Sequence, residues 1–491
     1  MSENTQTTAA TCPAALAVTD TATAERARDH RGLALVALLV GAFLPPLDYF
    51  IVNLALPAIR SGLHASAAEL QLIVSAYASA YAVFLITGGR LGDLYGRKRI
   101  FMLGMGGFVL SSLLCGFASS GAMLIGGRIL KGLSASMLAP QVLATIRTVF
   151  PQQQQTRIMG IYGFVFGLAA VIGQLGGGAL ITLHPFGLDW RAIFLVNLPI
   201  GIAALLGTWR YIPENRPAHG ASVDIPGVIL LSACLWLIIY PLTHGREQGW
   251  PAWTMLSLAA SVPTLALFLW VERRHLRMGR DPLLDLRLFR HPAFAIGLLL
   301  AFLFYCDSVF FLTYGVYLQD GLHWTPLTAG FAIMPFALGF IVGPLASPRL
   351  AQHIHSHVLT VGFALLTIGF SVVAMQAGRS ALPGLPFYAG LLVAGLGHGL
   401  VQPSVVRIAL AEVRPEQAGT ASGVVLATLQ IGAAVGAAAI SGIFFSVLGQ
   451  HPAQVDYALA FRASLRVLSG LLAACIGFSL LLRWLQHRRA A

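Results

Sequence analysis

Long apolar segments follow one another along almost the whole chain, separated by short polar connections. A helix of about 20 mostly apolar residues crosses the hydrocarbon core of a bilayer. Fourteen stretches of that kind can be placed: 33–59, 69–88, 100–118, 122–149, 158–183, 191–212, 227–242, 253–271, 292–318, 327–348, 357–377, 383–410, 418–448 and 465–485. The pattern predicts an all-α integral membrane protein with fourteen transmembrane helices.

The distribution of Lys and Arg predicts the orientation of these helices. When both ends of the chain are placed on one side, the connections on that side carry 23 basic residues and those on the other side carry six. The six are Arg60, Arg191, Arg246, Arg379, Arg462 and Arg466. Because Lys and Arg are retained on the cytoplasmic side of a membrane, both termini are predicted to be cytoplasmic.

The longest charged connection, residues 272–290, follows the eighth span and indicates how the chain is divided. We expect a disordered cytoplasmic tail at residues 1–30 and a six-helix bundle at 31–215. Two extra transmembrane helices at 216–275 and a second six-helix bundle at 276–486 follow. No segment outside the membrane is large enough to fold alone.

Composition excludes several other classes of protein. Hydrophobic residues make up 57% of the chain and charged residues 10%, whereas a soluble protein carries about 25% charged residues. The net charge of +12 does not indicate a nucleic-acid-binding protein, because the basic residues lie between apolar spans. The five cysteines are scattered without a metal-ligand spacing, so we expect no metal site and no redox role.

Motifs of enzyme chemistry are absent from the sequence, which has no HExxH, no GxSxG and no P-loop GxxxxGK[ST] pattern. We therefore expect neither an enzyme nor a bound cofactor. The sequence also has no visible site for ATP, so we expect that any energy the protein uses comes from an ion gradient.

A compact charged loop, residues 89–99, joins the second and third spans and carries Gly89, Asp93, Gly96, Arg97 and Lys98. The glycines allow close backbone approach and tight turning, and the four basic residues of the loop mark the side that faces the cytoplasm. Asp93 is expected near the start of the following helix, where a carboxylate suits the positive end of the helix dipole. The alternative is a basic cytoplasmic loop with no further role.

A partial copy of this loop occurs at residues 343–349, at the end of the tenth span. It keeps the glycine and a base, but Ser347 stands where the first loop has its acid. Related halves are common in transporters. If the loop at 89–99 and its copy at 343–349 hold the two halves of the chain together, we expect the two loops to make different contacts, because only the first carries an acid.

Two charged positions fall inside apolar runs of the first half. Asp48 lies in the first span, where burial favours the protonated form of a carboxyl, and we interpret it as a site for a proton or a cation. The alternative is a residue at the membrane interface. Arg128 in the fourth span needs a partner or a water-filled cavity, unless its side chain extends to the interface. Lys131, three residues later, leaves the charge balance open.

The second half has its own acid, Asp307, in an apolar run rich in aromatic residues: Tyr305, Phe310, Phe311, Tyr314 and Tyr317. A carboxylate beside aromatic rings suits an amphipathic organic cation. The alternative is that several of these rings only pack or face lipid. His398 and Gln402, one turn apart on the twelfth span, are candidates to line the same cavity, and a hydrogen-bonded core histidine is an equal alternative.

Several of these motifs resemble those of the major facilitator superfamily. The loop at 89–99 resembles the superfamily signature G-x-L-x-D-x-x-G-R-K, and residues 124–136 resemble L-x-x-x-R-x-x-Q-G-x-G-A-A, with Lys131 in place of Gln. Residues 47–57 resemble the run L-D-x-T-V-V-N-x-A-L-P of the fourteen-helix drug:proton antiporter family, with Phe50 in place of Thr. Residues 189–201 resemble its entry into the sixth helix, W-R-W-I-F-x-I-N-x-P-I-G.

The fifth span resembles the antiporter motif G-x-x-x-G-P-x-x-G-G through Gly173, Gly177 and Gly178, with Gln174 in place of the proline. That proline is associated with exchange in the family, so its absence weakens the motif. The alternative interpretation is that small residues allow close helix packing in lipid.

The resemblance implies a major facilitator fold in the cell (inner) membrane, whose two bundles rock about a central cavity near Asp48 and Asp307. It implies proton-driven export of hydrophobic or cationic compounds, with proton coupling at Asp48, Arg128 and Asp307. Export of one metabolite, such as a sugar, a siderophore or an amino acid, is the alternative within transport. A receptor or scaffold is the alternative outside it. Family members in double-membrane bacteria can work with a periplasmic adaptor and an outer-membrane channel.

Overall fold

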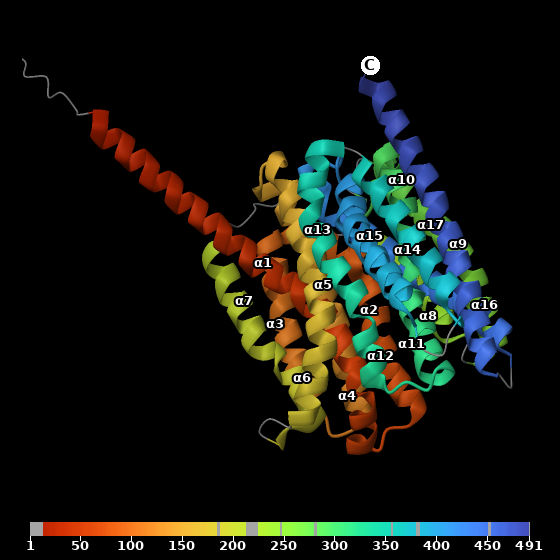
Figure 1. Cartoon of the computed structure of the whole chain (residues 1–491). Helices are drawn as coiled ribbons and strands as arrows, with labels where there is room; N and C mark the ends of the chain where they lie inside the picture. The colour runs from red at the N-terminus through yellow and green to blue at the C-terminus, as the bar shows by residue number, and fades with distance from the viewer. Residues whose placement is uncertain are drawn as a thin grey trace, which may run out of the picture.

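The structure is a computed structural model that describes residues 13–183, 187–212, 224–245, 248–278, 282–354, 357–379, 383–449 and 453–490. Within those ranges every regular element is helical, and 14 candidate membrane spans are present. This confirms the all-α class and the predicted number of spans. The first turn of α1 and the last turn of α17 lie at the same end of the bundle (Figure 1).

The first half contains α1 (Pro13–Leu63), α2 (Ala67–Tyr95), α3 (Arg97–Gly116), α4 (Gly121–Val149) and α5 (Gln152–Leu183). Its sixth span combines η2 (Asp189–Arg191), α6 (Ala192–Leu195) and α7 (Asn197–Tyr211). The helix α1 begins inside the segment predicted to be a tail, and residues 1–12 lie outside the described part of the chain. Helices α8 (Ile225–His244) and α9 (Ala252–Arg277) follow.

The second half begins with η3 (Leu286–Arg290) and a broken span: α10 (Pro292–Tyr305), η4 (Cys306–Ser308), α11 (Val309–Val316) and η5 (Tyr317–Gly321). Then come α12 (Pro326–Ala332), α13 (Met334–Ile354), α14 (Val358–Gln376) and α15 (Leu385–Ala409). The chain ends with η7 (Pro415–Gln417), α16 (Ala418–Leu448) and α17 (Gln454–Ala490).

The two halves meet along α2 with α16 and along α5 with α13. Glycines permit this approach. A Cβ added at Gly89 would lie 2.1 Å from the carbonyl oxygen of Gly419, and one at Gly160 would lie 2.6 Å from that of Pro344. Small residues let helix backbones pack closely in lipid, where no hydrophobic force draws helices together. These contacts lie toward the end of the molecule that carries the loop at 89–99 (Figure 1).

The helices α8 and α9 form a pair at the junction of the halves. The helix α8 packs against both α2 and α16, while α9 packs against α8. The Ser75 hydroxyl of α2 lies 2.9 Å from Nε2 of His244 at the end of α8. At the other end, Asp224 accepts from the backbone of Gly227 at 2.8 Å and lies 2.9 Å from Nδ1 of His275.

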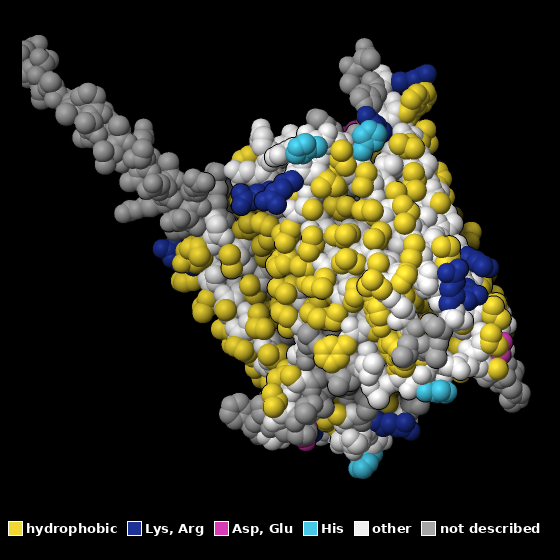
Figure 2. Space-filling view, in the orientation of Figure 1, with side chains coloured by type: hydrophobic (Ala, Val, Ile, Leu, Met, Phe, Trp, Pro, Cys, Tyr) yellow, Lys and Arg dark blue, Asp and Glu magenta, His cyan; other side chains and the backbone are white. Residues whose placement is uncertain are grey.

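Hydrophobic side chains cover the middle of the visible face, and most charged side chains lie toward its margins (Figure 2). This is the surface that a multi-pass membrane protein needs, because lipid tails solvate apolar groups and exclude charge.

Candidate functional site

Asp48 lies at the centre of a buried charge cluster in the first half. Its carboxylate, on α1, accepts hydrogen bonds from Arg128 and Lys131, both on α4, and all three side chains are fully buried. Asn197 at the start of α7 donates a third hydrogen bond at 3.2 Å. The cluster thus joins three helices of one bundle through a single carboxylate.

The two cations of this cluster have further partners. Arg128 donates through Nε to the carbonyl oxygen of Ile73 at 2.9 Å and lies 4.3 Å from the ring centre of Tyr77. The Lys131 ammonium lies 4.7 Å from the ring centre of Phe108. Asp48 and Arg128 are therefore both paired inside the first bundle, and neither side chain extends to the protein surface. Two cations and one carboxylate leave one uncompensated positive charge, which rings such as these stabilise.

Asp307 occupies the break in the first span of the second half. The turn η4 interrupts the helix there, and α16 passes so close that a Cβ at Gly436 would lie 2.5 Å from the carbonyl oxygen of Cys306. One carboxylate oxygen of Asp307 lies 2.9 Å from Nδ1 of His398 on α15. The other oxygen is buried without a hydrogen-bond partner among the described residues.

His398 is held among phenylalanine rings. Its ring centre lies 4.8 Å from that of Phe304 and 4.7 Å from that of Phe340. One turn further along α15, Gln402 is buried with its Oε1 unpaired in the described part of the chain. The structure brings His398 to Asp307 as a buried, hydrogen-bonded histidine, a pairing that the sequence did not predict.

The aromatic residues of this span have different surroundings. Tyr305 is half-buried and packs edge-on against Phe304. Tyr314 is buried, and its hydroxyl has no hydrogen-bond partner among the residues described. Phe311 is 43% exposed and packs edge-on against Phe336. Buried polar atoms are normally paired by protein, water or ligand, so the unpaired atoms of Asp307, Gln402 and Tyr314 are candidates for contact with a bound molecule.

Asp93 does not cap the helix that follows it. Its carboxylate accepts hydrogen bonds from the backbone amides of Gly419 at 3.0 Å and Thr420 at 2.8 Å, at the start of α16 in the other half. The principle behind the prediction was correct, because a carboxylate does sit at a helix N-terminus. The predicted helix was wrong, because Asp93 lies in the last turn of α2 and its side chain points across the junction.

Other residues of the same loop strengthen this contact between the halves. Arg97 donates to Asp93 at 3.0 Å, to Thr148 at 2.9 Å and to the carbonyl oxygen of Pro415. Gly96, at φ +100°, makes the turn between α2 and α3. Lys98 remains within its own half and donates to the carbonyl oxygen of Trp209 at 2.8 Å.

The partial copy of the loop makes a different contact. Within the described residues, no hydrogen bond joins positions 343–349 to α5, and Pro344 packs directly on Gly160 and Gly163. Two contacts of unlike chemistry therefore hold the halves at this end, one polar and one apolar.

A further polar contact ties the connection after α9 to α16. Gln417 donates to Asp285 at 3.0 Å, and Arg287 donates to the same carboxylate at 3.0 Å. Burial opposes the ionisation of Asp285, but the hydrogen bonds from Arg287 and Gln417 outweigh it and lower the pKa of this carboxyl. The two extra helices are thus linked to the point where the halves meet.

The antiporter-like glycines of α5 face α1. A Cβ at Gly173 would lie 2.8 Å from the Cβ of Phe50, and one at Gly177 would lie 2.8 Å from Cγ1 of Ile51. Close helix packing next to Asp48 is thus one role of these positions. The predictions for Gln174 and Gly178 concern side-chain positions that lie outside the described residues.

Three contributors to these sites were not predicted. Asn197 lies in residues 189–201, where the resemblance assigned no role to any residue, and Thr420 lies in the span 418–448, which contains no charged residue. Arg147, which donates to the carbonyl oxygen of Ala411 at 2.8 Å across the halves, carries no sequence signal beyond its basic charge.

Sequence comparison matches the family described as Major Facilitator Superfamily over residues 38–437 and, in a second match, over residues 296–490. The chain is 37% identical over 432 residues to a protein of Streptomyces coelicolor named as a probable actinorhodin transporter, covering 87% of this chain and 75% of the relative. It is 36% identical over 428 residues to the puromycin resistance protein pur8 of Streptomyces alboniger, covering 84% and 82%. It is 32% identical over 421 residues to the multidrug resistance protein Stp of Mycobacterium tuberculosis, covering 84% and 75%.

Solved structures share the fold at low sequence identity. The human organic anion transporter MFSD10 (TETRAN) aligns with a TM-score of 0.66 at 17% identity, covering 92% of this chain and 99% of that one. The proton:xylose symporter XylE aligns with a TM-score of 0.61 at 12% identity, covering 90% and 95%.

Proposed function

The chain belongs to the Major Facilitator Superfamily, and from that premise we propose that it exports hydrophobic or cationic drug-like compounds in exchange for protons. The relatives named above support export, because their names refer to transport of one antibiotic, resistance to another and multidrug resistance. Membership of a transporter superfamily also agrees with the absence of enzyme motifs.

The observation that carries the proposal is the buried pair of Asp307 and His398. When His398 is neutral, the pair bears one negative charge, and the unpaired oxygen of Asp307 is available to a substrate cation. When a proton binds, the charge of the pair is compensated within the protein. Proton and cation therefore compete for the same charge, which is the requirement for exchange.

The substrate is expected to lie against Tyr305 and Tyr314, with Phe311 and Gln402 at its margins. Aromatic faces attract organic cations and tolerate different shapes. An unpaired amide oxygen at Gln402 adds one acceptor for a substrate donor. These surroundings favour a hydrophobic cation over a sugar, which needs many hydrogen-bonding groups.

Asp48, Arg128 and Lys131 form a second ionisable centre, in the first half. A substrate cation reaches Asp48 only by displacing two cations that already bind it. We therefore assign this cluster to holding the first bundle together and to setting its charge, while proton exchange takes place at Asp307 and His398.

Alternating access follows from the contacts between the halves. The Asp93 and Arg97 contacts close the end that carries the loop, which is the cytoplasmic end if both termini are cytoplasmic. Breaking them opens the substrate site to that side. The residues at Gly173 and Gly177 keep α5 tightly against α1 while the halves move.

A resistance screen tests the proposal. The gene is expressed in a pump-deficient host and challenged with hydrophobic cations and with neutral antibiotics, with and without a proton uncoupler. Resistance to several cations that the uncoupler abolishes supports the proposal. Transport of a single sugar, siderophore or amino acid supports the alternative, and dependence on a co-expressed adaptor and outer-membrane channel identifies those as partners.

A further inference from the structure

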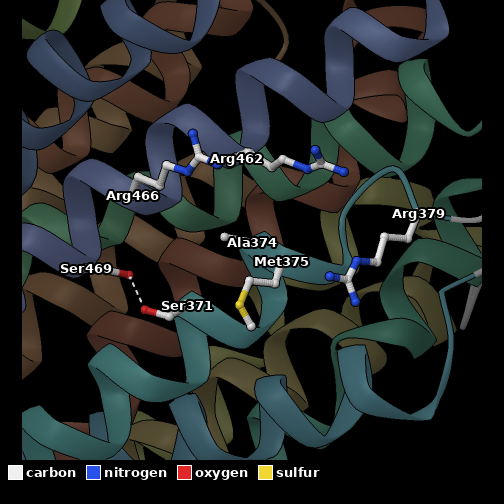
Figure 3. Close-up of a pocket in the computed structure, with 7 residues that line it drawn as sticks. All are labelled: Ser371, Ala374, Met375, Arg379, Arg462, Arg466 and Ser469. Carbon is white, nitrogen blue, oxygen red and sulfur yellow. Dashed lines mark hydrogen bonds between the residues drawn. The ribbon is translucent and has the colours of Figure 1, made fainter.

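A cavity of about 370 Å³ lies between α14 and α17, away from the Asp307 site. Its walls carry three arginines and two serines: Arg379, Arg462, Arg466, Ser371 and Ser469. Figure 3 shows Arg462 and Arg466 projecting from α17 on one side and Arg379 from the turn after α14 on the other. Half of the six arginines that the sequence assigns to the sparsely charged side of the membrane thus meet at one place.

The backbone around this cavity is fixed by specific contacts. Arg462 donates through Nε to the carbonyl oxygen of Ala377 at 2.7 Å, where α14 ends. Gly378 then turns the chain at φ +70°, a conformation that favours glycine, and donates to the Tyr317 hydroxyl at 3.0 Å. These bonds set the direction in which Arg379 leaves the helix.

The charge of the cavity is uncompensated. No Asp or Glu of the described residues lies within ion-pair distance of Arg379, Arg462 or Arg466. On the wall of the cavity the Ser371 hydroxyl is hydrogen-bonded to the Ser469 hydroxyl at 3.3 Å and to the carbonyl oxygen of Thr367 at 2.7 Å, which leaves the Ser469 hydroxyl hydrogen as a neutral donor. Guanidinium groups with nearby hydroxyls match the oxygens of a phosphate.

A strip of small residues extends from the cavity along the exposed face of α17. Gly470, Ala473, Ala474 and Gly477 lie below Arg466 at helical spacing, and all four are exposed. A Cβ added at Gly470 or Gly477 would meet nothing within 4 Å. On α14, the exposed side chain of Met375 borders the same cavity. A cationic cavity with an open apolar strip beside it is complementary to a phospholipid, because the cavity can hold the charged headgroup and the strip can hold an acyl chain.

We propose that this cavity binds the headgroup of an anionic glycerophospholipid, with one acyl chain along the small residues of α17. The three arginines hold the phosphate and select a net negative headgroup, and the strip at 470–477 selects a lipid over a free anion. The position of the site, at the end opposite the loop at 89–99, assigns it to the outer leaflet if both termini are cytoplasmic.

The test uses the full-length protein purified in a mild non-ionic detergent and native mass spectrometry with added phosphatidylglycerol or phosphatidylethanolamine. We expect a preference for phosphatidylglycerol, and a loss of about tenfold or more in its binding in the double variant R379Q/R466Q, since two of the three guanidinium groups that hold the phosphate are removed. R60Q, at another exposed arginine of the same end, is the matched control and should bind like the wild type.

The variant G470L separates the two sources of phosphate. It fills open space on the strip and leaves every charge in place, so it should lower phosphatidylglycerol binding several-fold without changing the thermal midpoint. Full lipid binding by G470L, together with stabilisation of the wild type by inorganic phosphate, would identify a site for free anions and overturn the proposal. Equal binding by the wild type and R379Q/R466Q would overturn it as well.

Discussion

The first membrane span of each half buries a carboxylate, and these two carboxylates, Asp48 and Asp307, have different partners. Asp48 binds Arg128, Lys131 and Asn197, so permanent cations surround it. Asp307 binds only His398, and its second oxygen is unpaired among the described residues. Two related bundles thus use the same residue type under opposite electrostatic conditions.

This difference in partners suits the two carboxylates to different roles: Asp48 to the stability of the first bundle and Asp307 to the exchange of a proton for a cation. A carboxylate between two cations cannot lose its charge without leaving both of them buried and unpaired, which is costly in a medium of low dielectric constant. Asp307 has one hydrogen-bond neighbour, His398, and one oxygen that is unpaired among the described residues, so a proton or a cation can bind there without displacing another cation. Under the proposed function, the first half therefore provides a fixed charge cluster, and the second half provides the site of exchange.

The largest effect is expected from D48N. This change leaves Arg128 and Lys131 buried without a carboxylate, and breaking a buried ion pair costs about 3–5 kcal/mol. Thermal unfolding of the detergent-purified protein should show a strong decrease in midpoint, together with a low yield. A D48N protein as stable as the wild type would contradict the structural role of the cluster.

A loss of function without loss of fold is expected from D307N. Asparagine keeps a hydrogen bond to His398 but cannot carry the negative charge, so substrate-driven proton flux in everted vesicles should fall at least about tenfold, as for loss of one charged contact. The thermal midpoint should remain close to that of the wild type. If D307N transports normally, the second half does not contain the exchange site.

A loss of proton coupling without loss of cation binding is expected from H398Q. Glutamine can donate a hydrogen bond to Asp307 but cannot take up a proton, so a cation should still bind while proton release on binding should fall several-fold. Binding of a fluorescent cation and proton release, measured on the same purified protein, separate the two effects. Normal proton release by H398Q would exclude His398 from coupling.

The smallest effect is expected from K131Q. Asp48 retains Arg128 and Asn197, and the cluster loses its uncompensated positive charge, so stability should change by less than about 1.5 kcal/mol in either direction. Chemical denaturation in detergent, compared directly with D48N, measures the difference. Equal damage from K131Q and D48N would mean that the cluster depends on the second cation.

The sequence predicted the fourteen spans because hydropathy and span length follow from the bilayer alone. It did not predict the break at η4, because the residues around Asp307 are as apolar as a continuous helix and the break depends on close contact with α16. It also assigned Asp93 to the wrong helix. Hydrogen bonds between α2 and α16 join positions more than 300 residues apart, and no local pattern reports them.

The pairing of Asp307 with His398 was only partly visible. Each residue was recognisable as a polar group in an apolar span, but their contact depends on how α10, α11 and α15 pack. Lys131 was recognisable as unusual, because it stands where the family motif has Gln, but the sequence did not show that it binds Asp48. In both cases the sequence identified the unusual residues and the packing identified their roles.

Substrate-induced proton release from the purified protein is the most direct test of the central claim. The protein is placed in weakly buffered detergent solution near pH 7, a hydrophobic cation that it exports is added, and the change in pH is recorded. The account predicts proton release by the wild type and by K131Q, and none by D307N. Normal release by D307N, with release abolished in K131Q, would place the exchange site in the first half and contradict the account.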